Sequence, residues 1–219
     1  MTSSVPPGNP GDAPEFDEEL VPQGVGPHPL PWPQDGRLDP ALLAQGDHRN
    51  VLDRYRYWTV EAIRADQERT RRPFHVAVEN WKRDPNIGAA VRNANAFGAA
   101  AFHVIGKKRW NSRGAMKTHL YMHLHHHETV EELLAFARTN ALTVVAVDNV
   151  AGAQDIMTAQ LPRACVLVFG QERDGISSAL QAAASLTVAI PTVGSTRSIN
   201  AGAASAVAMF AWCQQHTRG

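Results

Sequence analysis

The sequence has few cysteines and no long apolar run. Its 219 residues include only Cys165 and Cys213, which excludes a disulfide framework and predicts two reduced, buried thiols. No apolar run approaches the ~18 residues that a membrane-spanning helix requires, and the first residues lack the basic and then apolar pattern of a secretory signal. We therefore expect a soluble, cytoplasmic protein without a membrane segment.

The chain also lacks net charge, but the charges are unevenly distributed. Its 21 basic residues equal its 21 acidic residues in number. Residues 1–40 hold seven acidic residues and one basic residue, which leaves 20 basic and 14 acidic residues in the remainder. A basic body of this kind suits a polyanionic partner.

The first 38 residues are acidic and rich in Pro and Gly. Such a segment buries too little apolar surface to offset its ordering entropy, so residues 1–38 are predicted to form a flexible tail. The alternative is that Leu30, Trp32 and Leu38 hold the end of this tail against the body.

Residues 39–72 are predicted to form a helical extension. Asp39 can cap a helix that begins at Pro40, and apolar residues at helical spacing predict a longer helix over residues 51–69. Seven arginines gather in this segment: Arg49, Arg54, Arg56, Arg64, Arg69, Arg71 and Arg72. Two interpretations stay open, a solvated helix face with interleaved acidic residues or an arm that contacts RNA.

Residues 73–219 are predicted to form one α/β domain. Apolar stretches that predict strands cover residues 74–79, 101–105, 142–147, 164–169 and 186–190, and helical patterns cover 87–97, 129–139, 177–184 and 200–215. Thr129 and Glu132 can form a capping box. This alternation predicts a parallel sheet that is covered by helices on both faces.

The two common nucleotide-binding fingerprints are absent. The first expected strand leads to Asn86-Ile87-Gly88, without the glycine pattern of a dinucleotide-binding turn. Gly170 and Gly175 have the spacing of a phosphate-binding loop, but Ile176 stands where that loop requires lysine. Both folds are therefore excluded.

Three turns at expected strand ends carry small and polar residues instead. They are NIGAAVRNANAFG from Asn86, FGQERDGIS from Phe169 and IPTVGSTRSINAGAA from Ile190. Together they resemble the three ordered motifs of the SpoU (TrmH-like) family of RNA ribose 2′-O-methyltransferases, within the SPOUT superfamily. One departure is Ala201-Gly202, which stands where the family usually has Val-Ser.

The resemblance implies a SPOUT-type sheet with a deep C-terminal trefoil knot that binds S-adenosyl-L-methionine. It also implies a homodimer in which the cofactor pocket of one subunit lies beside the first-motif helix of the other, a tRNA or rRNA substrate, and no metal. The residues that match catalytic positions are Arg92, Asn86, Glu172, Ser198 and Asn200. The candidates for cofactor contact are Phe169, Gly170, Ile190, Val193, Gly194, Ser198 and Ile199.

Arg92 matches the catalytic arginine of the family. Arginine is a poor general base because its ordinary pKa exceeds about 12. Two roles therefore stay open, a base whose pKa the site lowers or a phosphate clamp that orients the ribose. A third alternative is a plain salt bridge on the helix surface.

The other matched residues also have structural alternatives. Asn86 is expected to cap the first-motif helix, since Asn is a preferred N-cap residue, and to orient Arg92 or the substrate. Glu172 can hold the site or be only an exposed charge. Ser198 and Asn200 can cap the last helix as well as serve the site.

Two further clusters of polar residues are candidates for binding. The cluster His119, His123, His125, His126 and His127 lacks a completing ligand set for zinc, so we expect a His-rich segment without a metal. The basic loop with Lys107, Lys108, Arg109 and Arg113 around Trp110 is interpreted as a phosphate-gripping loop, with a solvated loop as the alternative. An RNA-binding member of the fold with lost or altered catalysis is the alternative function.

Overall fold

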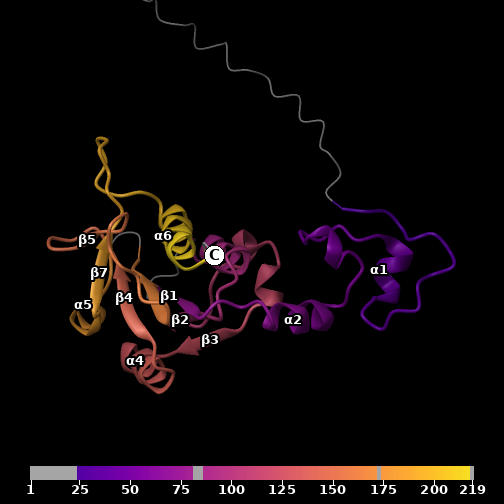
Figure 1. Ribbon diagram of the computed structural model, residues 1–219, viewed down its shortest axis with the longest axis horizontal. Helices are drawn as coiled ribbons and strands as arrows, with labels where there is room; N and C mark the ends of the chain where they lie inside the picture. The colour runs from indigo at the N-terminus through magenta and orange to yellow at the C-terminus, as the bar shows by residue number, and fades with distance from the viewer. Residues whose placement is uncertain (1–23, 81–85, 172–173, 218–219) are drawn as a thin grey trace, which may run out of the picture.

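A computed structural model describes residues 24–80, 86–171 and 174–217 (Figure 1). Glu172 lies outside the described residues, as does the segment 1–23 of the predicted tail. Among the described residues, no helix is long and apolar enough to cross a membrane.

Within these described ranges, seven strands form one sheet in the order β3-β2-β1-β6-β4-β7-β5. The strands are β1 (Phe74–Asn80), β2 (Phe102–Gly106), β3 (Leu124–His127), β4 (Thr143–Val147), β5 (Gln154–Asp155), β6 (Cys165–Phe169) and β7 (Leu186–Ala189). All paired strands are parallel. This confirms the predicted α/β class and parallel sheet, while the knot stays a prediction.

Helices cover both faces of the sheet. α3 (Ile87–Ala96) and α6 (Ala201–His216) share one apolar core with the face of β1 that carries Phe74 and Val76. α4 (Val130–Thr139) and α5 (Ser178–Ala183) share a second core with the opposite face, which carries Ala77. Successive residues of a strand point to opposite faces, so β1 contributes to both cores.

Two strands were not expected from the sequence. β3 is built largely of histidine and β5 has only two residues, so neither presents the apolar run that marked the other strands. Two short 3₁₀ turns, η2 (Arg113–Ala115) and η3 (Thr118–Tyr121), precede β3. The Thr129 hydroxyl accepts from the Glu132 amide as predicted, but the Glu132 carboxylate accepts from the Glu128 amide.

The extension contains α1 (Pro40–Gln45) and α2 (Val60–Glu68). Asp39 caps α1 as predicted, with its carboxylate 2.8 Å from the Ala41 amide nitrogen. The prediction of a continuous helix over residues 51–69 is wrong. Before Tyr57 this stretch forms only a 3₁₀ turn, η1 (Asp53–Tyr55). Tyr57 has a φ of +64°, which is incompatible with a right-handed helix, and Thr59 then caps α2.

Residues 24–38 are hydrogen-bonded to this extension. The Val25 amide donates to the Asp47 carbonyl at 3.0 Å, and the His28 amide donates to the Leu43 carbonyl at 2.8 Å. Leu38 pairs with Trp58 in an isolated bridge. These contacts agree with the alternative in which the end of the tail is held against the body, through Leu38.

Candidate active site

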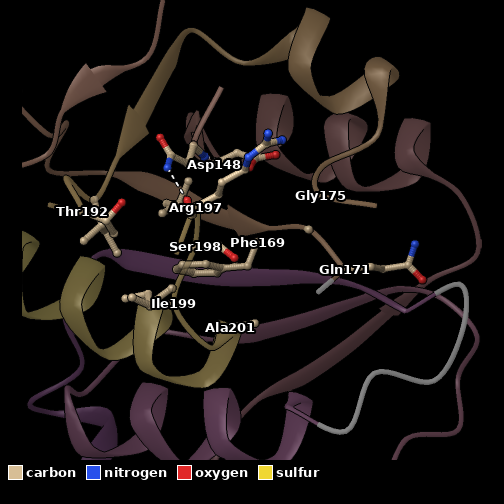
Figure 2. A pocket seen from close by; sticks show the side chains of 14 residues that line it. Asp148, Phe169, Gln171, Gly175, Thr192, Arg197, Ser198, Ile199 and Ala201 are labelled. Atoms are coloured by element: carbon tan, nitrogen blue, oxygen red, sulfur yellow. Dashed lines mark hydrogen bonds between the residues drawn. The ribbon is translucent and has the colours of Figure 1, made fainter. Parts of the chain in front are cut away.

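A cavity of about 270 Å³ lies where β4, β6 and β7 end (Figure 2). The carboxyl ends of parallel strands meet at one edge of the sheet, which is where open α/β sheets bind ligands. The residues that line the cavity are Val147, Asp148, Asn149, Phe169, Gly170, Gln171, Gly175, Ile190, Thr192, Arg197, Ser198, Ile199, Ala201 and Ala204. Both the second and the third motif therefore contribute to it.

Five of the seven predicted cofactor residues line this cavity: Phe169, Gly170, Ile190, Ser198 and Ile199. Val193 and Gly194 do not line it. The Val193 side chain is fully exposed, and a Cβ built on Gly194 would have no heavy atom of the described residues within 4 Å. The loop between β7 and α6 carries these two residues away from the cavity and returns at Arg197.

The turn after β6 is closed by its own backbone. The amides of Gln171 and Gly175 donate to each other's carbonyl oxygens at 3.0 and 2.9 Å. A Cβ on Gly170 would lie 2.0 Å from the carbonyl carbon of Gly175, and Gly175 has φ +66°. Both positions therefore require glycine.

Asp148 and Asn149 complete one wall, and the sequence reasoning missed them. The Asp148 carboxylate accepts from the Ile176 amide at 2.9 Å. The Asn149 side chain donates to the Arg197 carbonyl at 2.6 Å (Figure 2). These bonds tie the end of β4 to the second and third motifs. A polar pair directly after an apolar strand is the signal that could have identified them.

Glu79 is a further residue that the sequence did not reveal. It lies at the end of β1 with a side chain that is buried, and its carboxylate accepts from the Ser177 amide at 2.8 Å. A smaller cavity beside the first one is lined by Glu79, Asn86, Phe169, Gly170 and Ala201, among others. The first motif therefore borders the second and third motifs through this smaller space.

A direct hydrogen bond joins the first motif to the third. The Asn200 side-chain nitrogen donates to the Asn86 side-chain oxygen at 2.8 Å, and the Asn200 oxygen caps α6 by accepting from the Ala203 amide at 3.2 Å. Asn86 stands at the N-cap position of α3, but its side chain makes no capping bond. Asn200 thus caps as predicted, whereas the expected capping by the Asn86 side chain is wrong.

α3 and α6 approach each other closely behind this bond. The Asn93 side chain donates to the Gly202 carbonyl at 2.8 Å and to the Ser205 hydroxyl at 3.0 Å. A Cβ on Gly202 would lie 3.0 Å from the Ala89 Cβ. Glycine at position 202, where the family usually has serine, therefore allows the close contact between α3 and α6. It does not displace Asn200.

Arg92 lies on the exposed side of α3 and lines neither cavity. Within one chain the structure therefore does not bring Arg92 to Ser198.

Two apolar side chains of α6 are exposed to solvent. The exposed fraction is 39% for Val207 and 58% for Phe210.

The basic loop after β2 leaves its charged side chains in solvent. Lys107, Lys108, Arg109 and Arg113 are exposed, whereas Trp110 packs against the core. The Asn80 side chain donates to the Lys107 carbonyl at 2.5 Å and to the Arg109 carbonyl at 3.2 Å. These two bonds attach the loop to the end of β1.

Three histidines form a hydrogen-bonded row under α4. A ring nitrogen of His103 lies 2.9 Å from one of His75, and the other lies 2.8 Å from one of His127. Burial, with the nearby histidines, lowers the pKa of His103 to about 2, and burial with the His125 charge lowers the pKa of His75 to about 4. In the part of the chain that the structure describes, no group of three or more His, Cys, Asp or Glu side chains is arranged to hold a metal.

Most of the extension's arginines are engaged within the chain. Arg49 pairs with Asp47, Arg56 with Asp53, Arg69 with Asp66 and Arg71 with Glu68. Arg54 and Arg64 are exposed. Four of the seven arginines therefore have carboxylate partners, as the solvated-face interpretation expects for interleaved charges.

Comparison with known proteins gives a consistent result. The family model described as the SpoU rRNA Methylase family matches residues 73–210. A tRNA (guanosine(18)-2′-O)-methyltransferase from Thermus thermophilus is 27% identical over 151 residues, which cover 65% of this chain and 75% of the relative. The 23S rRNA (guanosine-2′-O-)-methyltransferase RlmB from Nitrosomonas europaea is 29% identical over 185 residues, with 80% and 68% coverage.

Two solved structures have the same fold. The TrmH/SpoU tRNA modifying enzyme of A. aeolicus superposes with a TM-score of 0.64 at 21% identity, over 72% of this chain and 82% of its own. The SpoU methyltransferase AviRb from Streptomyces viridochromogenes, in complex with AdoMet, gives 0.61 at 25% identity, over 68% of this chain. The match spans only 60% of the AviRb chain. Because the family model matches well over half of the chain, this protein belongs to the SpoU rRNA Methylase family, as the three motifs predicted.

Proposed function

We propose that this chain transfers a methyl group from S-adenosylmethionine to a ribose 2′-hydroxyl of tRNA or rRNA in the cytoplasm. One observation carries the proposal. Residues from the second and third motifs share a cavity, and the bond between Asn86 and Asn200 links that cavity to the first motif. Membership of the SpoU family supports the same reaction.

The residues of the cavity fit S-adenosylmethionine. Phe169, Ile190 and Ile199 offer apolar surface for an adenine, and the turn at Gly170 leaves no side chain between a ligand and the backbone. Ser198 and Thr192 add hydroxyl groups. When bound, the cofactor supplies an electrophilic methyl group, and the chain's residues hold and orient it.

The reaction needs an aligned ribose oxygen and a destination for its proton. Ser198 and Asn200 offer a hydroxyl and an amide at the start of α6, and Asn86 fixes the Asn200 amide. Glu172 is proposed to hold the site on the basis of its motif. Arg92 is proposed either to accept the proton or to clamp a phosphate beside the ribose.

A homodimer would give Arg92 a site to act on. It is exposed on α3 and lies outside the cavities of its own chain. Val207 and Phe210 expose apolar surface on the neighbouring α6, which packs against α3. We propose that a second copy covers this surface and places each Arg92 beside the other subunit's cavity.

Nucleoside analysis of RNA from cells with and without the gene tests the reaction. A 2′-O-methylated nucleoside should disappear from tRNA or rRNA of the deletion strain, and the purified protein should bind S-adenosylmethionine in calorimetry. If no such nucleoside is lost and the cofactor does not bind, the enzyme proposal falls. The RNA-binding alternative without catalysis then replaces it.

Arg92→Ala should abolish methyl transfer while cofactor affinity is kept. The matched control is Arg138→Ala, since Arg138 is an exposed arginine on α4 across the sheet. Mixing Arg92→Ala with the cavity variant Ile199→Asp tests the dimer. If each Arg92 serves the partner's cavity, mixed dimers regain one intact site and the mixture recovers about a quarter of wild-type activity. No recovery, with subunit exchange verified, would place Arg92 in its own subunit's site.

A further inference from the structure

A second cavity, also of about 270 Å³, lies between the N-terminal extension and the end of α3. We call it the extension groove. The residues that line it include Leu52, Arg54, Tyr55, Arg71, Arg72 and Phe97. It shares no residue with either cavity of the candidate active site.

The charge of the extension groove has one sign. Among the described residues that line it, three are arginines and none is an aspartate or glutamate. Arg71 is committed to the fold, because its guanidinium donates to Glu68 at 2.9 Å and to the Tyr121 carbonyl at 2.9 Å. Arg54 is exposed and lies 4.7 Å above the Tyr55 ring. The groove therefore presents a stacked, accessible guanidinium that can pair with an anion.

Apolar groups stand beside these charges. Leu52 is 62% exposed at the groove, and Phe97 is only partly buried there. Apolar surface and a guanidinium together suit a nucleotide, which has a flat base and a phosphate.

α3 connects the extension groove to the first motif. The helix begins at Ile87, next to Asn86 in the smaller cavity, and its last turn lines the groove. Ten helical residues span about 15 Å. Arg92 is exposed between these ends, one helical turn before Ala96. An RNA strand held beside Arg92 would therefore extend to the groove.

We propose that the extension groove binds a single-stranded nucleotide of the RNA substrate, next to the segment that is methylated. Its base lies against Leu52 and Phe97, and its phosphate pairs with Arg54. The proposal rests on the proposed function for the identity of the RNA. It assigns substrate selection to the junction between the extension and α3.

Binding of total tRNA and total rRNA from a deletion strain tests this proposal. Arg54→Ala and Leu52→Asp should each weaken the binding of the substrate RNA by about tenfold. Arg54→Ala should also reduce the slope of log affinity against log salt by about one, because one phosphate contact is lost. S-adenosylmethionine affinity should not change, since neither residue lines the active-site cavity.

Arg64→Ala is the matched control, because Arg64 is exposed on α2 and does not line the groove. If Arg54→Ala and Leu52→Asp bind RNA as tightly as Arg64→Ala does, the proposal is overturned. It is also overturned if both variants lose binding of a polyglutamate peptide but not of RNA, which would indicate a protein partner. Both variants are at exposed positions, and thermal melting checks that they fold.

The two proposals fail separately. If the wild-type protein methylates no RNA but Arg54→Ala still weakens RNA binding, the proposed reaction is wrong and the proposed nucleotide site in the groove is retained. If the wild-type protein methylates RNA and the groove variants bind and methylate it normally, only the groove proposal is wrong.

Discussion

Two cavities of about 270 Å³ are built in different ways in this protein. The active-site cavity is shaped by backbone turns and small residues at strand ends, such as Gly170 and Gly175. The extension groove is shaped by long side chains, including Arg54, Arg71 and Phe97. A single added carbon should therefore weaken ligand binding in the active-site cavity, whereas the loss of a charged side chain should weaken ligand binding in the extension groove.

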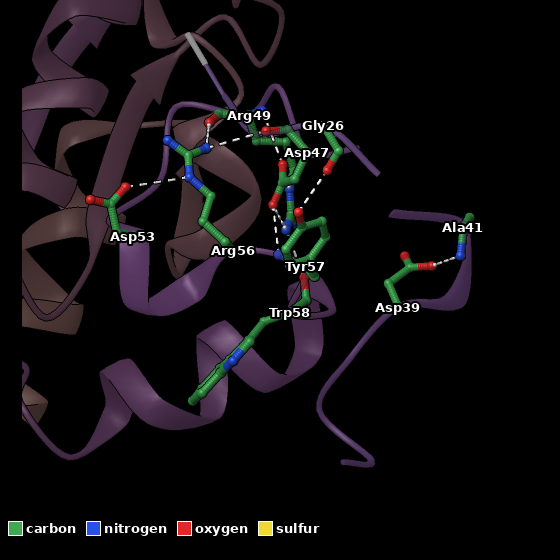
Figure 3. Close-up of polar contacts among 9 residues, drawn as sticks. All are labelled: Gly26, Asp39, Ala41, Asp47, Arg49, Asp53, Arg56, Tyr57 and Trp58. Atoms are coloured by element: carbon green, nitrogen blue, oxygen red, sulfur yellow. Dashed lines mark hydrogen bonds and ion pairs between the residues drawn. The ribbon is translucent and has the colours of Figure 1, made fainter. Parts of the chain in front are cut away.

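The extension itself depends on a buried carboxylate (Figure 3). Asp47 is fully buried and accepts from the Arg49 guanidinium at 2.8 and 2.7 Å and from the Tyr57 amide at 2.9 Å. Arg49 also donates to the Trp58 carbonyl at 2.8 Å. The wall of the groove follows this hub in sequence, since Leu52 and Tyr55 lie between Arg49 and Tyr57.

The largest expected effect on cofactor binding comes from Gly170→Ala. Its Cβ would overlap the backbone of Gly175 at 2.0 Å, and backbone atoms cannot turn aside as a flexible side chain can. We expect S-adenosylmethionine affinity in calorimetry to fall by roughly 100-fold or more, which corresponds to about 3 kcal/mol. RNA binding through the extension groove should be largely kept.

Gly194→Ala is the control for this change, because a Cβ there meets no atom within 4 Å. It should leave cofactor affinity within about twofold of wild type, a difference of about 0.4 kcal/mol. Equal losses in both variants would show that Gly194 contacts the cofactor after all. They would also remove the contrast between the two ways of building a cavity.

Asp47→Asn should affect stability strongly and the cofactor site little. Removing one partner of a buried ion pair leaves the Arg49 charge uncompensated, which costs about 3–5 kcal/mol. Chemical denaturation should report this loss, while S-adenosylmethionine affinity stays at the wild-type value. A variant that loses cofactor affinity in proportion would indicate that the extension supports both cavities.

The pH dependence of stability distinguishes this role from simple packing. Burial raises the pKa of Asp47, but hydrogen bonds from Arg49 and Tyr57 outweigh it and lower the pKa from 3.8 to about 2. A depressed carboxylate pKa stabilises the fold above the unfolded-state value and loses this stabilisation as the pH falls. The wild type should therefore lose stability between about pH 4 and pH 2 more steeply than Asp47→Asn does.

The two regions also differ in how much of their structure could be predicted from the sequence. The parallel sheet, most of its strands and the shared cavity of the second and third motifs followed from apolar runs and glycine turns, which act locally. The role of Asn86 did not, because its partner Asn200 is distant in sequence. Nothing local distinguishes a capping asparagine from one that bonds another loop.

The extension was predicted less well, because its structure depends on contacts between distant residues. Helical periodicity over residues 51–69 did not indicate that Tyr57 would adopt a positive φ. This backbone conformation is held by the hydrogen bond from the Tyr57 amide to the buried Asp47 carboxylate. The strand β3 was missed for a related reason. His127 belongs to a buried row only because His103 lies on the neighbouring strand.

The smallest effect is expected at Gly202, where the motif departs from the family. Gly202→Ala would gain up to about 1 kcal/mol of helix propensity. It would also place a Cβ 3.0 Å from the Ala89 Cβ and 3.1 Å from the Asn200 side-chain oxygen, so α3 must shift by a few tenths of an ångström. Overpacking of this kind costs about 1–3 kcal/mol, and we expect a net destabilisation of about 1 kcal/mol in chemical denaturation.

Ala89→Gly in the same chain tests the cause of that loss. It removes the methyl group that Gly202→Ala would meet, so the double variant should be more stable than the two single effects predict, by about 0.5–1 kcal/mol. Strict additivity would mean that the Ala89 contact does not limit residue 202. The glycine would then be explained by its place beside Asn200, and the contact of Asn200 with Asn86 should weaken in Gly202→Ala, with a matching fall in methyl transfer.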